Sequence, residues 1–213
     1  MQLVKRYEVE CDVLKNTCSG YLAISPFDRA ISFIFRGSSI PQYLYENFFF
    51  ATYSQKDFEA GGKVLTYWHD AFYCLWNSGI SEDLQQLIRE YPDYELWVFG
   101  HSLGGVLASL STMVTITRGI FPAERIKYIS FGEPRIGNVV FAQSFDALVP
   151  YKYRIVREHD LIPNQPQNLD LWDVIRSFTI DMRYGTQIRC FHAIPISYVK
   201  AQKTLDVVIP DLT

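Results

Sequence analysis

This chain of 213 residues is 48% hydrophobic and carries a formal net charge of −3 at pH 7. A chain of this length and composition can bury one complete core, and no linker or repeat divides it, so we expect a single domain over residues 1–213. Its basic residues are dispersed, and it lacks an apolar stretch long enough to cross a bilayer. These features argue against a nucleic-acid-binding protein and against a transmembrane segment.

The sequence contains no motif for a cofactor or a metal. Gly132 and Gly137 lack the third glycine and the flanking context of a nucleotide-binding loop. The four cysteines form no C-x-x-C pair, and the four histidines form no H-E-x-x-H motif. We therefore expect no cofactor and no metal ion.

The first predicted strand covers residues 30–35, an apolar run of β-prone residues. It ends at the turn Arg36-Gly37-Ser38-Ser39. A glycine-containing turn at the end of a strand can present backbone N–H groups to a ligand, or its serines can cap local backbone. The spacing alone leaves both interpretations open.

Two amphipathic helices are predicted next. The apolar face of the first, after two glycines, consists of Val64, Trp68, Ala71, Phe72 and Leu75. The second helix is expected to begin near Ser81, whose hydroxyl would cap it, with Glu82 and Asp83 in its first turn. Pro92 is expected to end it.

The most informative segment begins with the apolar strand 95–99 and continues as Gly100-His101-Ser102-Leu103-Gly104-Gly105. An apolar helix is expected to follow through about Thr117. A strand, a G-x-S-x-G turn and a helix in this order describe a nucleophile elbow, a tight turn that holds a serine hydroxyl clear of the sheet. The segment therefore predicts that Ser102 attacks an ester carbonyl.

A serine nucleophile needs donors for the oxyanion that forms on the substrate. The backbone N–H of Leu103, directly after the nucleophile, is one candidate. The N–H of Ser38, at the end of the earlier strand, is the other, and the Ser38 hydroxyl can add a third donor.

A carboxylate must orient the base, and we expect it after a later strand. Further strands are predicted at 126–131 and 153–157, and the second is followed by Asp160. Active-site residues of open α/β sheets gather at the carboxyl ends of strands, which favours Asp160. Glu158 and Asp146 are the rivals, and both are more typical of solvated surface charges. An aspartate at this point can also merely cap a turn.

The base is selected among four histidines. His69 lies in a predicted helix upstream of the nucleophile, and His101 is its chain neighbour, poorly placed to accept its proton. His159 adjoins the acid, where local packing is the simpler interpretation. His192 remains, and it satisfies the chain order serine, aspartate, histidine. A histidine in a surface loop is the competing interpretation of His192.

Because strands alternate with helices, the chain is expected to form an α/β fold with a mostly parallel sheet and helices on both faces. Three blocks make the resemblance to a family specific: Phe35–Ser39, Trp97–Gly105 and Phe131–Asn138. They resemble, in the same order, the signature blocks of class 3 (fungal-type) lipases. The resemblance covers roughly Cys11 to Pro163 and implies the α/β-hydrolase fold and hydrolysis of acylglycerols or related carboxylic esters.

The resemblance also implies roles for individual residues. Ser102 corresponds to the family's nucleophile, and Ser38 with Leu103 to its oxyanion hole. Asp160 stands immediately before an apolar pair and a proline, as the family's acid does. The tail from about residue 170 is atypical, because His192 follows the acid sooner than the family leads one to expect.

The same tail contains Gly185-Thr186-Gln187-Ile188, which resembles a family stretch that has an acid in place of Gln187. Two hypotheses follow. Either a shortened tail brings His192 to Ser102, giving a serine esterase that acts through an acyl-enzyme, or the base is missing and the chain is a lipase-like protein that binds lipid without catalysis. Phospholipids and soluble aryl esters remain alternative substrates.

In the lipase family the segment past the oxyanion loop contributes a lid that opens at an oil–water interface. This chain has a cluster of aromatic residues there: Tyr43, Tyr45, Phe48, Phe49, Phe50 and Tyr53. Core packing is the more common role of aromatic residues at such density, and a lid that makes transient contact with a lipid interface is the alternative.

The cysteines and the first residues of the chain indicate whether the protein is secreted or intracellular. Cys11 and Cys18 can bridge a short loop, and their segment resembles the start of secreted class 3 lipases, whereas Cys74 and Cys190 are an uncertain pair. The first six residues lack the apolar core of a signal peptide. We expect a secreted protein without its leader, with an intracellular protein as the alternative.

Overall fold

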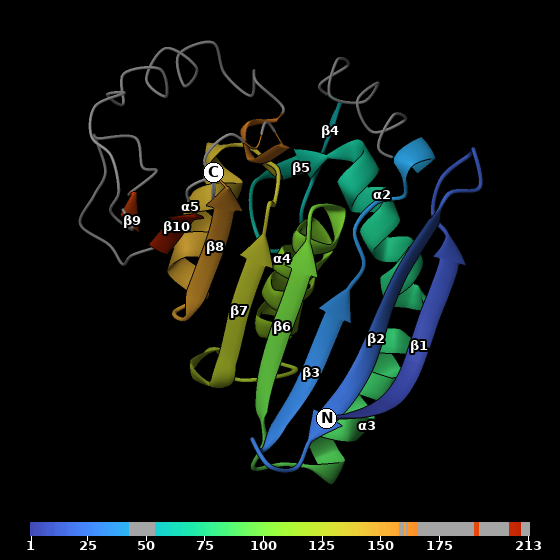
Figure 1. Cartoon of the computed structure of the whole chain (residues 1–213), viewed down its shortest axis with the longest axis vertical. Helices are drawn as coiled ribbons and strands as arrows, with labels where there is room; N and C mark the ends of the chain where they lie inside the picture. The colour runs from blue at the N-terminus through green and yellow to red at the C-terminus, as the bar shows by residue number, and fades with distance from the viewer. Residues whose placement is uncertain (43–53, 158–159, 161, 166–189, 192–204, 210–213) are drawn as a thin grey trace.

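The computed structural model describes residues 1–42, 54–157, 160, 162–165, 190–191 and 205–209. Its main sheet has the strand order β1-β2-β3-β6-β7-β8-β10-β9 (Figure 1). These strands are β1 (Gln2–Glu10), β2 (Thr17–Ser25), β3 (Ala30–Phe35), β6 (Glu95–His101), β7 (Ile126–Phe131), β8 (Lys152–Arg157), β9 (Cys190–Phe191) and β10 (Leu205–Ile209). A second, small sheet pairs β4 (Gln55–Asp57) with β5 (Lys63–Leu65).

The centre of the main sheet is parallel. Strands β3, β6, β7, β8 and β10 run in one direction, whereas β1, β2 and β9 pair with their neighbours in the antiparallel sense. The mostly parallel sheet expected from the sequence is therefore confirmed, and the carboxyl ends of β3, β6, β7 and β8 meet at one edge. That edge carries four of the predicted site residues: Ser38, Ser102, Leu103 and Asp160.

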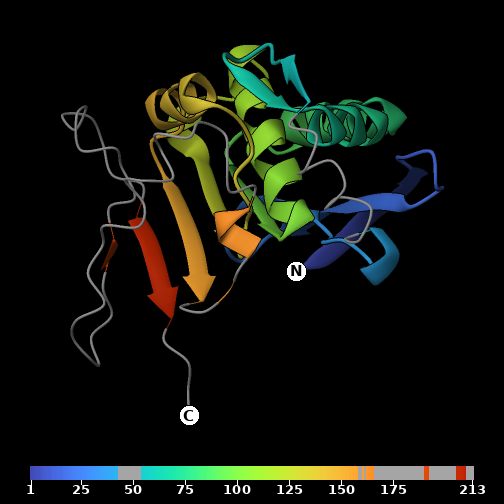
Figure 2. The ribbon, with the colours of Figure 1, turned by 90° about the horizontal axis from the view of Figure 1, so that it is seen from above.

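The longer helices of the described residues are α2 (Thr66–Leu75), α3 (Ser81–Glu90), α4 (Leu103–Thr117) and α5 (Val139–Leu148), with a kinked π-helical turn from Trp76 to Ile80 between the first two. Viewed from above, they lie together on one side of the sheet (Figure 2). The sequence predicts helices on both faces of the sheet. In the described part of the chain, these helices cover one face.

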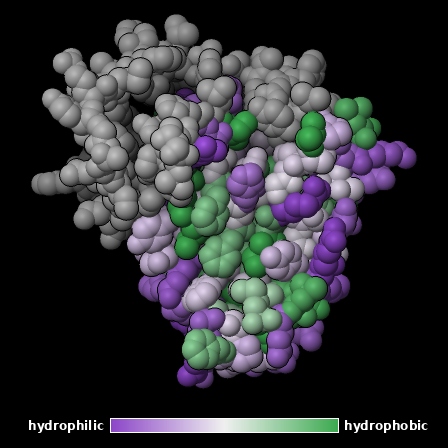
Figure 3. Space-filling view, viewed as in Figure 1, coloured by the Kyte–Doolittle hydropathy of each residue, from purple (hydrophilic) through white to green (hydrophobic). Residues whose placement is uncertain are grey.

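The burial pattern of the strands agrees with this arrangement. In β6, Leu96 and Val98 are fully buried beneath α4, whereas Trp97 and Phe99 on the opposite face are only half-buried. The opposite face is the one turned to the viewer in Figure 1, and its surface shows apolar side chains among polar ones (Figure 3). One face of β6 thus forms the core and the other contacts solvent.

Two expected helix starts differ from the observed ones. Val64 lies in β5, paired with Lys56, so the first helix begins at Thr66, although its other four predicted apolar residues are buried as expected. The predicted cap at Ser81 is wrong: Ile80 already has helical angles, and the Ser81 hydroxyl donates to the Glu82 carboxylate instead. Gly79, with φ 100° and ψ −4°, interrupts the helical backbone just before, so the helix starts again at this kink and Ser81 already lies inside its first turn.

The hairpin between β1 and β2 is closed by a disulfide between Cys11 and Cys18. The carboxylate of Asp12 accepts hydrogen bonds from the backbone N–H groups of Leu14 and Asn16, which shapes the loop. The pairing of Cys11 with Cys18 is as expected. Cys74 carries a free, exposed thiol, and the Cys190 side chain lies outside the described residues.

In the described residues, none of the helices combines the length and apolar character required to cross a bilayer.

Candidate active site

Ser102 occupies a sharp turn between β6 and α4, as the sequence predicts. Its backbone has φ 55° and ψ −125°, a conformation that residues with a side chain rarely adopt. Three hydrogen bonds hold the turn: the Ser102 N–H donates to the Phe131 carbonyl at 2.9 Å, and the Ser102 carbonyl accepts from the N–H groups of Gly105 at 2.8 Å and Val106 at 3.3 Å. Strained backbone held by its surroundings is common at functional sites.

Two glycines of the turn are required by close approach of the backbone. A Cβ atom at Gly100 would lie 1.9 Å from the carbonyl oxygen of Gly104, and one at Gly104 would lie 2.3 Å from that of Phe35. Neither position has room for any side chain. The tight packing of β6, α4 and the end of β3 thus explains both glycines of the G-x-S-x-G motif.

The turn after β3 lies directly against the elbow. A Cβ atom at Gly37 would lie 2.8 Å from the His101 carbonyl oxygen and 3.5 Å from the Ser102 Cβ. Ser38, the predicted oxyanion donor, follows at once, and Leu103, the second predicted donor, is buried at the start of α4. The geometry therefore brings the segments that carry Ser102, Leu103 and Ser38 together.

Side chains on both sides of this turn fix its course. Arg36 donates through Nε to the Ser19 hydroxyl at 2.8 Å, and its N–H donates to the Ser19 carbonyl at 2.9 Å. The buried Gln42 accepts from the Ser39 N–H at 3.3 Å and contacts the sulfurs of Cys11 and Cys18. The turn is thereby anchored to β2 and to the disulfide.

Asp160 follows β8, the strand next to β7. Its Oδ1 atom accepts from the Ile162 N–H at 2.9 Å, and its own N–H donates to the Arg157 carbonyl at 3.1 Å. The other carboxylate oxygen points toward Gly132, where a Cβ atom would lie 3.2 Å from Asp160 Oδ2 and 3.6 Å from His101 Nε2. The loop after β7 is therefore the place where Asp160 and the elbow residue His101 come close.

The described residues include only some of the histidines and carboxylates considered for the triad. His192, His159 and Glu158 lie outside the described residues, as does the aromatic cluster within 43–53. His69 lies on α2, where its Nδ1 is 2.8 Å from the Asp70 carboxylate. Asp146, a rival acid, faces Lys152 at 3.4 Å. The described part of the chain thus supplies two of the three predicted triad residues.

Glu133 and Arg154 are residues near the site to which the sequence reasoning gave no role. Glu133 belongs to a signature block, is only 4% exposed and has three hydroxyl groups around its carboxyl group. Arg154 connects it to the loop that carries Asp160. The only sequence signal was the position of Glu133 inside a block that resembles the lipase family.

No group of three or more His, Cys, Asp or Glu side chains suited to a metal ion occurs among the described residues. A serine on an elbow, backbone N–H groups beside it and a carboxylate at the next strand end suit acyl transfer.

Comparison with known proteins supplies an independent finding. The family model described as "Lipase (class 3)" matches residues 32–169. A Caenorhabditis elegans lipase is 34% identical over 164 residues, which are 77% of this chain and 46% of the relative. A secreted mono- and diacylglycerol lipase of Gibberella zeae is 32% identical over 108 residues, 50% of this chain and 33% of the relative.

The fold also matches solved lipases. One structure, described as a triacylglycerol lipase whose catalytic centre is a serine protease triad, has a TM-score of 0.65 and 25% identity. The match covers 78% of this chain and 60% of that one. The chain spans about half the length of the nematode relative and a third of the Gibberella one.

Proposed function

This chain belongs to the class 3 lipase family, and on that premise we propose that it is a serine hydrolase that cleaves carboxylic esters, with acylglycerols as its substrate class. The observation that carries the proposal is the strained turn at Ser102, fitted between β6 and α4 with Gly37 against it. The relatives support the substrate class, since one is described as a mono- and diacylglycerol lipase and another as a triacylglycerol lipase.

The proposed reaction has two steps. The Ser102 hydroxyl attacks the ester carbonyl while His192 accepts its proton, and the backbone N–H groups of Ser38 and Leu103 hold the oxyanion. His192 then gives the proton to the departing alcohol. Water, activated in the same way, cleaves the acyl-enzyme and restores the serine.

Asp160 is the proposed orienting acid. Its Oδ1 is occupied by the Ile162 N–H, which fixes the carboxyl group and leaves Oδ2 directed toward Gly132. A carboxylate held in this way can keep an imidazole in the required tautomer and stabilise the imidazolium that forms. His192 follows in the chain order typical of elbow hydrolases.

The proposal also includes contact with lipid, the cellular compartment and the number of domains. The substrate class is water-insoluble, so we propose a transient contact with a lipid interface. The disulfide between Cys11 and Cys18 favours an oxidising compartment, which supports a secreted protein. We also propose that residues 1–213 form one domain.

Substitutions paired with matched controls test the assignment. Ser102→Ala and His192→Ala should each lower the turnover of a soluble p-nitrophenyl ester by about 10⁶-fold, and Asp160→Asn should lower it by about 10⁴-fold. The controls are His69→Ala and Asp146→Asn, which change the same residue types elsewhere and should keep full turnover. Circular dichroism checks that every variant is folded.

Each outcome decides one part of the assignment. Turnover retained in Ser102→Ala rejects the nucleophile, and turnover retained in His192→Ala alone moves the base to another residue. Comparing emulsified acylglycerols with phospholipid vesicles and soluble aryl esters then tests the substrate class. A folded wild-type protein that binds lipid but cleaves none of these would support the non-catalytic alternative.

A further inference from the structure

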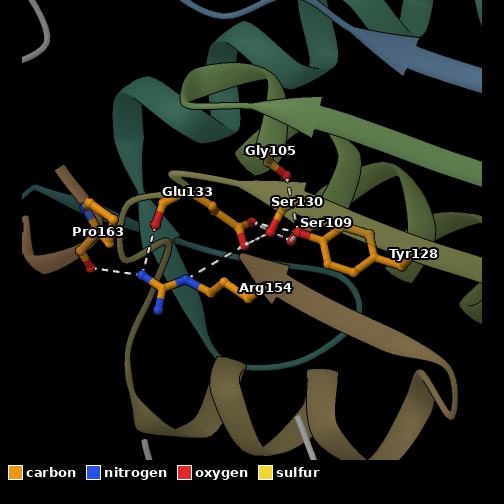
Figure 4. Close-up of polar contacts among 7 residues, drawn as sticks. All are labelled: Gly105, Ser109, Tyr128, Ser130, Glu133, Arg154 and Pro163. Atoms are coloured by element: carbon orange, nitrogen blue, oxygen red, sulfur yellow. Dashed lines mark hydrogen bonds and ion pairs between the residues drawn. The ribbon is translucent and has the colours of Figure 1, made fainter. Parts of the chain in front are cut away.

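The buried carboxyl group of Glu133 is the centre of a polar cluster beside the proposed site (Figure 4). The hydroxyls of Ser109 and Tyr128 donate to Oε1 at 2.5 and 2.8 Å, and that of Ser130 donates to Oε2 at 2.7 Å. Burial and the neighbouring Glu133 charge raise the pKa of Tyr128 well above its ordinary value. A buried carboxyl group is costly unless its oxygens are bonded, and these donors satisfy it.

The cluster extends through Arg154 to the segment of the proposed acid. One guanidinium nitrogen of Arg154 donates to the carbonyl oxygens of Glu133 and Pro163, each at 2.7 Å. Its Nε lies 3.9 Å from the Glu133 carboxylate. Pro163 belongs to the short helical turn that follows Asp160, so Arg154 joins that turn to Glu133 (Figure 4).

On its other side the cluster contacts the helix that begins after Ser102. A Cβ atom at Gly105, in the first turn of α4, would lie 3.0 Å from the Glu133 Cβ. Ser109, one turn further along the helix, donates directly to the carboxylate. Glu133 is thus in contact with α4, and through Arg154 it is connected to the turn behind Asp160.

We propose that Glu133 and Arg154 are positioning residues that hold the Asp160 loop in register with the helix that carries Ser102. Neither needs to touch the reacting atoms. The inference rests on the proposed roles of Ser102 and Asp160 and adds the residues that set their separation. Arginine suits the task because its planar guanidinium can donate in several fixed directions, which the point charge of lysine cannot reproduce.

A substitution with a matched control separates positioning from general stability. Arg154→Lys keeps the charge and should lower kcat about 10- to 100-fold with little change in KM, since a shift of about 1 Å in a catalytic group has effects of this size. The control is Arg125→Lys, because Arg125 also bridges two carbonyl oxygens, those of Pro92 and Tyr94, away from the site. It should lower the melting temperature similarly and keep kcat.

A double-mutant cycle tests whether the effect acts through the acid. Arg154→Lys should lower kcat in the wild-type background and have no further effect in an Asp160→Asn background. Glu133→Gln, which keeps the shape of the side chain, should behave in the same way and serves if an Arg154 variant does not fold.

Three results would overturn the inference. The first is unchanged kcat in both Arg154→Lys and Glu133→Gln. The second is an effect of equal size in the Asp160→Asn background, which would indicate a purely structural role. The third is full activity of Asp160→Asn itself, which would reject the proposed acid and with it the positioning role. Since Asp160→Asn keeps only a small residual turnover in the first two cases and full turnover in the third, the two failures are distinguishable.

Discussion

The backbone N–H of Ser102 donates to the carbonyl oxygen of Phe131 at 2.9 Å, which ties the elbow to the end of β7. The next residue, Gly132, has φ +55° and lies against the Asp160 carboxylate. The elbow and the loop that carries Asp160 therefore meet over the same two residues, Phe131 and Gly132. Changes at this junction are expected to affect turnover more than stability.

Gly132→Ala is expected to lower kcat/KM for a soluble ester about 10-fold or more, because its Cβ would press on Asp160 Oδ2 from 3.2 Å. The positive φ should also cost about 1 kcal/mol of stability. Steady-state kinetics and urea denaturation measure the two effects separately.

Gly119→Ala is the matched control for this change. Gly119 has φ +65°, close to that of Gly132, but no atom lies within 4 Å of its ideal Cβ position. It should lose a similar amount of stability and keep its turnover. Equal turnover in the two variants would show that Gly132 does not shape the site.

Ser102→Gly is expected to unfold at a higher urea concentration than Ser102→Ala. Both variants lack the hydroxyl, but only glycine adopts φ 55° and ψ −125° without strain. The expected difference is about 1 kcal/mol in the free energy of unfolding. If alanine proves equally stable, the elbow is not strained.

The disulfide at the tip of the hairpin is expected to stabilise the fold by about 2.5 kcal/mol, the loop-entropy value for a loop of about eight residues. Replacing Cys11 and Cys18 together by serine should lower the melting temperature, and dithiothreitol should lower that of the wild type equally. Cys74→Ser, which changes a free thiol, should have little effect. A double variant as stable as the wild type would contradict this expectation.

The ion pair between Glu59 and Arg118 gives a prediction for acid pH. Two hydrogen bonds from Arg118, at 2.9 and 2.7 Å, lower the pKa of Glu59 below its ordinary value of 4.5. Because the folded pKa is the lower one, the stabilisation is present above about pH 4.5 and is lost as the pH falls through the folded pKa. Glu59→Gln should therefore reduce stability at pH 7 by about 1 kcal/mol or less.

Melting curves between pH 3 and pH 7 check this, and those of wild type and Glu59→Gln should converge at the acid end. Asp57→Asn is the control. The Asp57 side chain beside Lys63 is 86% exposed, so this substitution should change the melting temperature little at any pH. A constant difference between wild type and Glu59→Gln across the range would reject the explanation.

Local sequence patterns predicted the centre of the fold well. Strand β3, the elbow and α4 could be read directly, because an apolar strand, a glycine turn and an apolar helix are determined by adjacent residues. The start of the first helix was missed because Val64 pairs with Lys56 across a hairpin, a contact that helical periodicity cannot reveal. The cap at Ser81 was wrong because the helix starts again directly after the kink at Gly79, which places Ser81 inside the first turn.

The polar contacts around the site were beyond sequence reasoning for a different reason. Nothing in the sequence indicated that Glu133 is buried, and its carboxyl group is satisfied by hydroxyls on α4 and β7, with Arg154 of β8 beside it. Such contacts join residues far apart in the chain. The position of Asp160 just after β8, by contrast, was predictable because it directly follows an apolar strand in the sequence, and its role as the acid remains a prediction.

The most direct test of the account is whether Ser102 is an activated nucleophile. The full chain is treated with an organophosphonate ester probe, which reacts with activated serines, and the adduct is mapped by peptide mass spectrometry. We predict one adduct, on Ser102, which is lost in Ser102→Ala and strongly slowed in His192→Ala. A folded wild-type protein that leaves Ser102 unmodified would contradict the account.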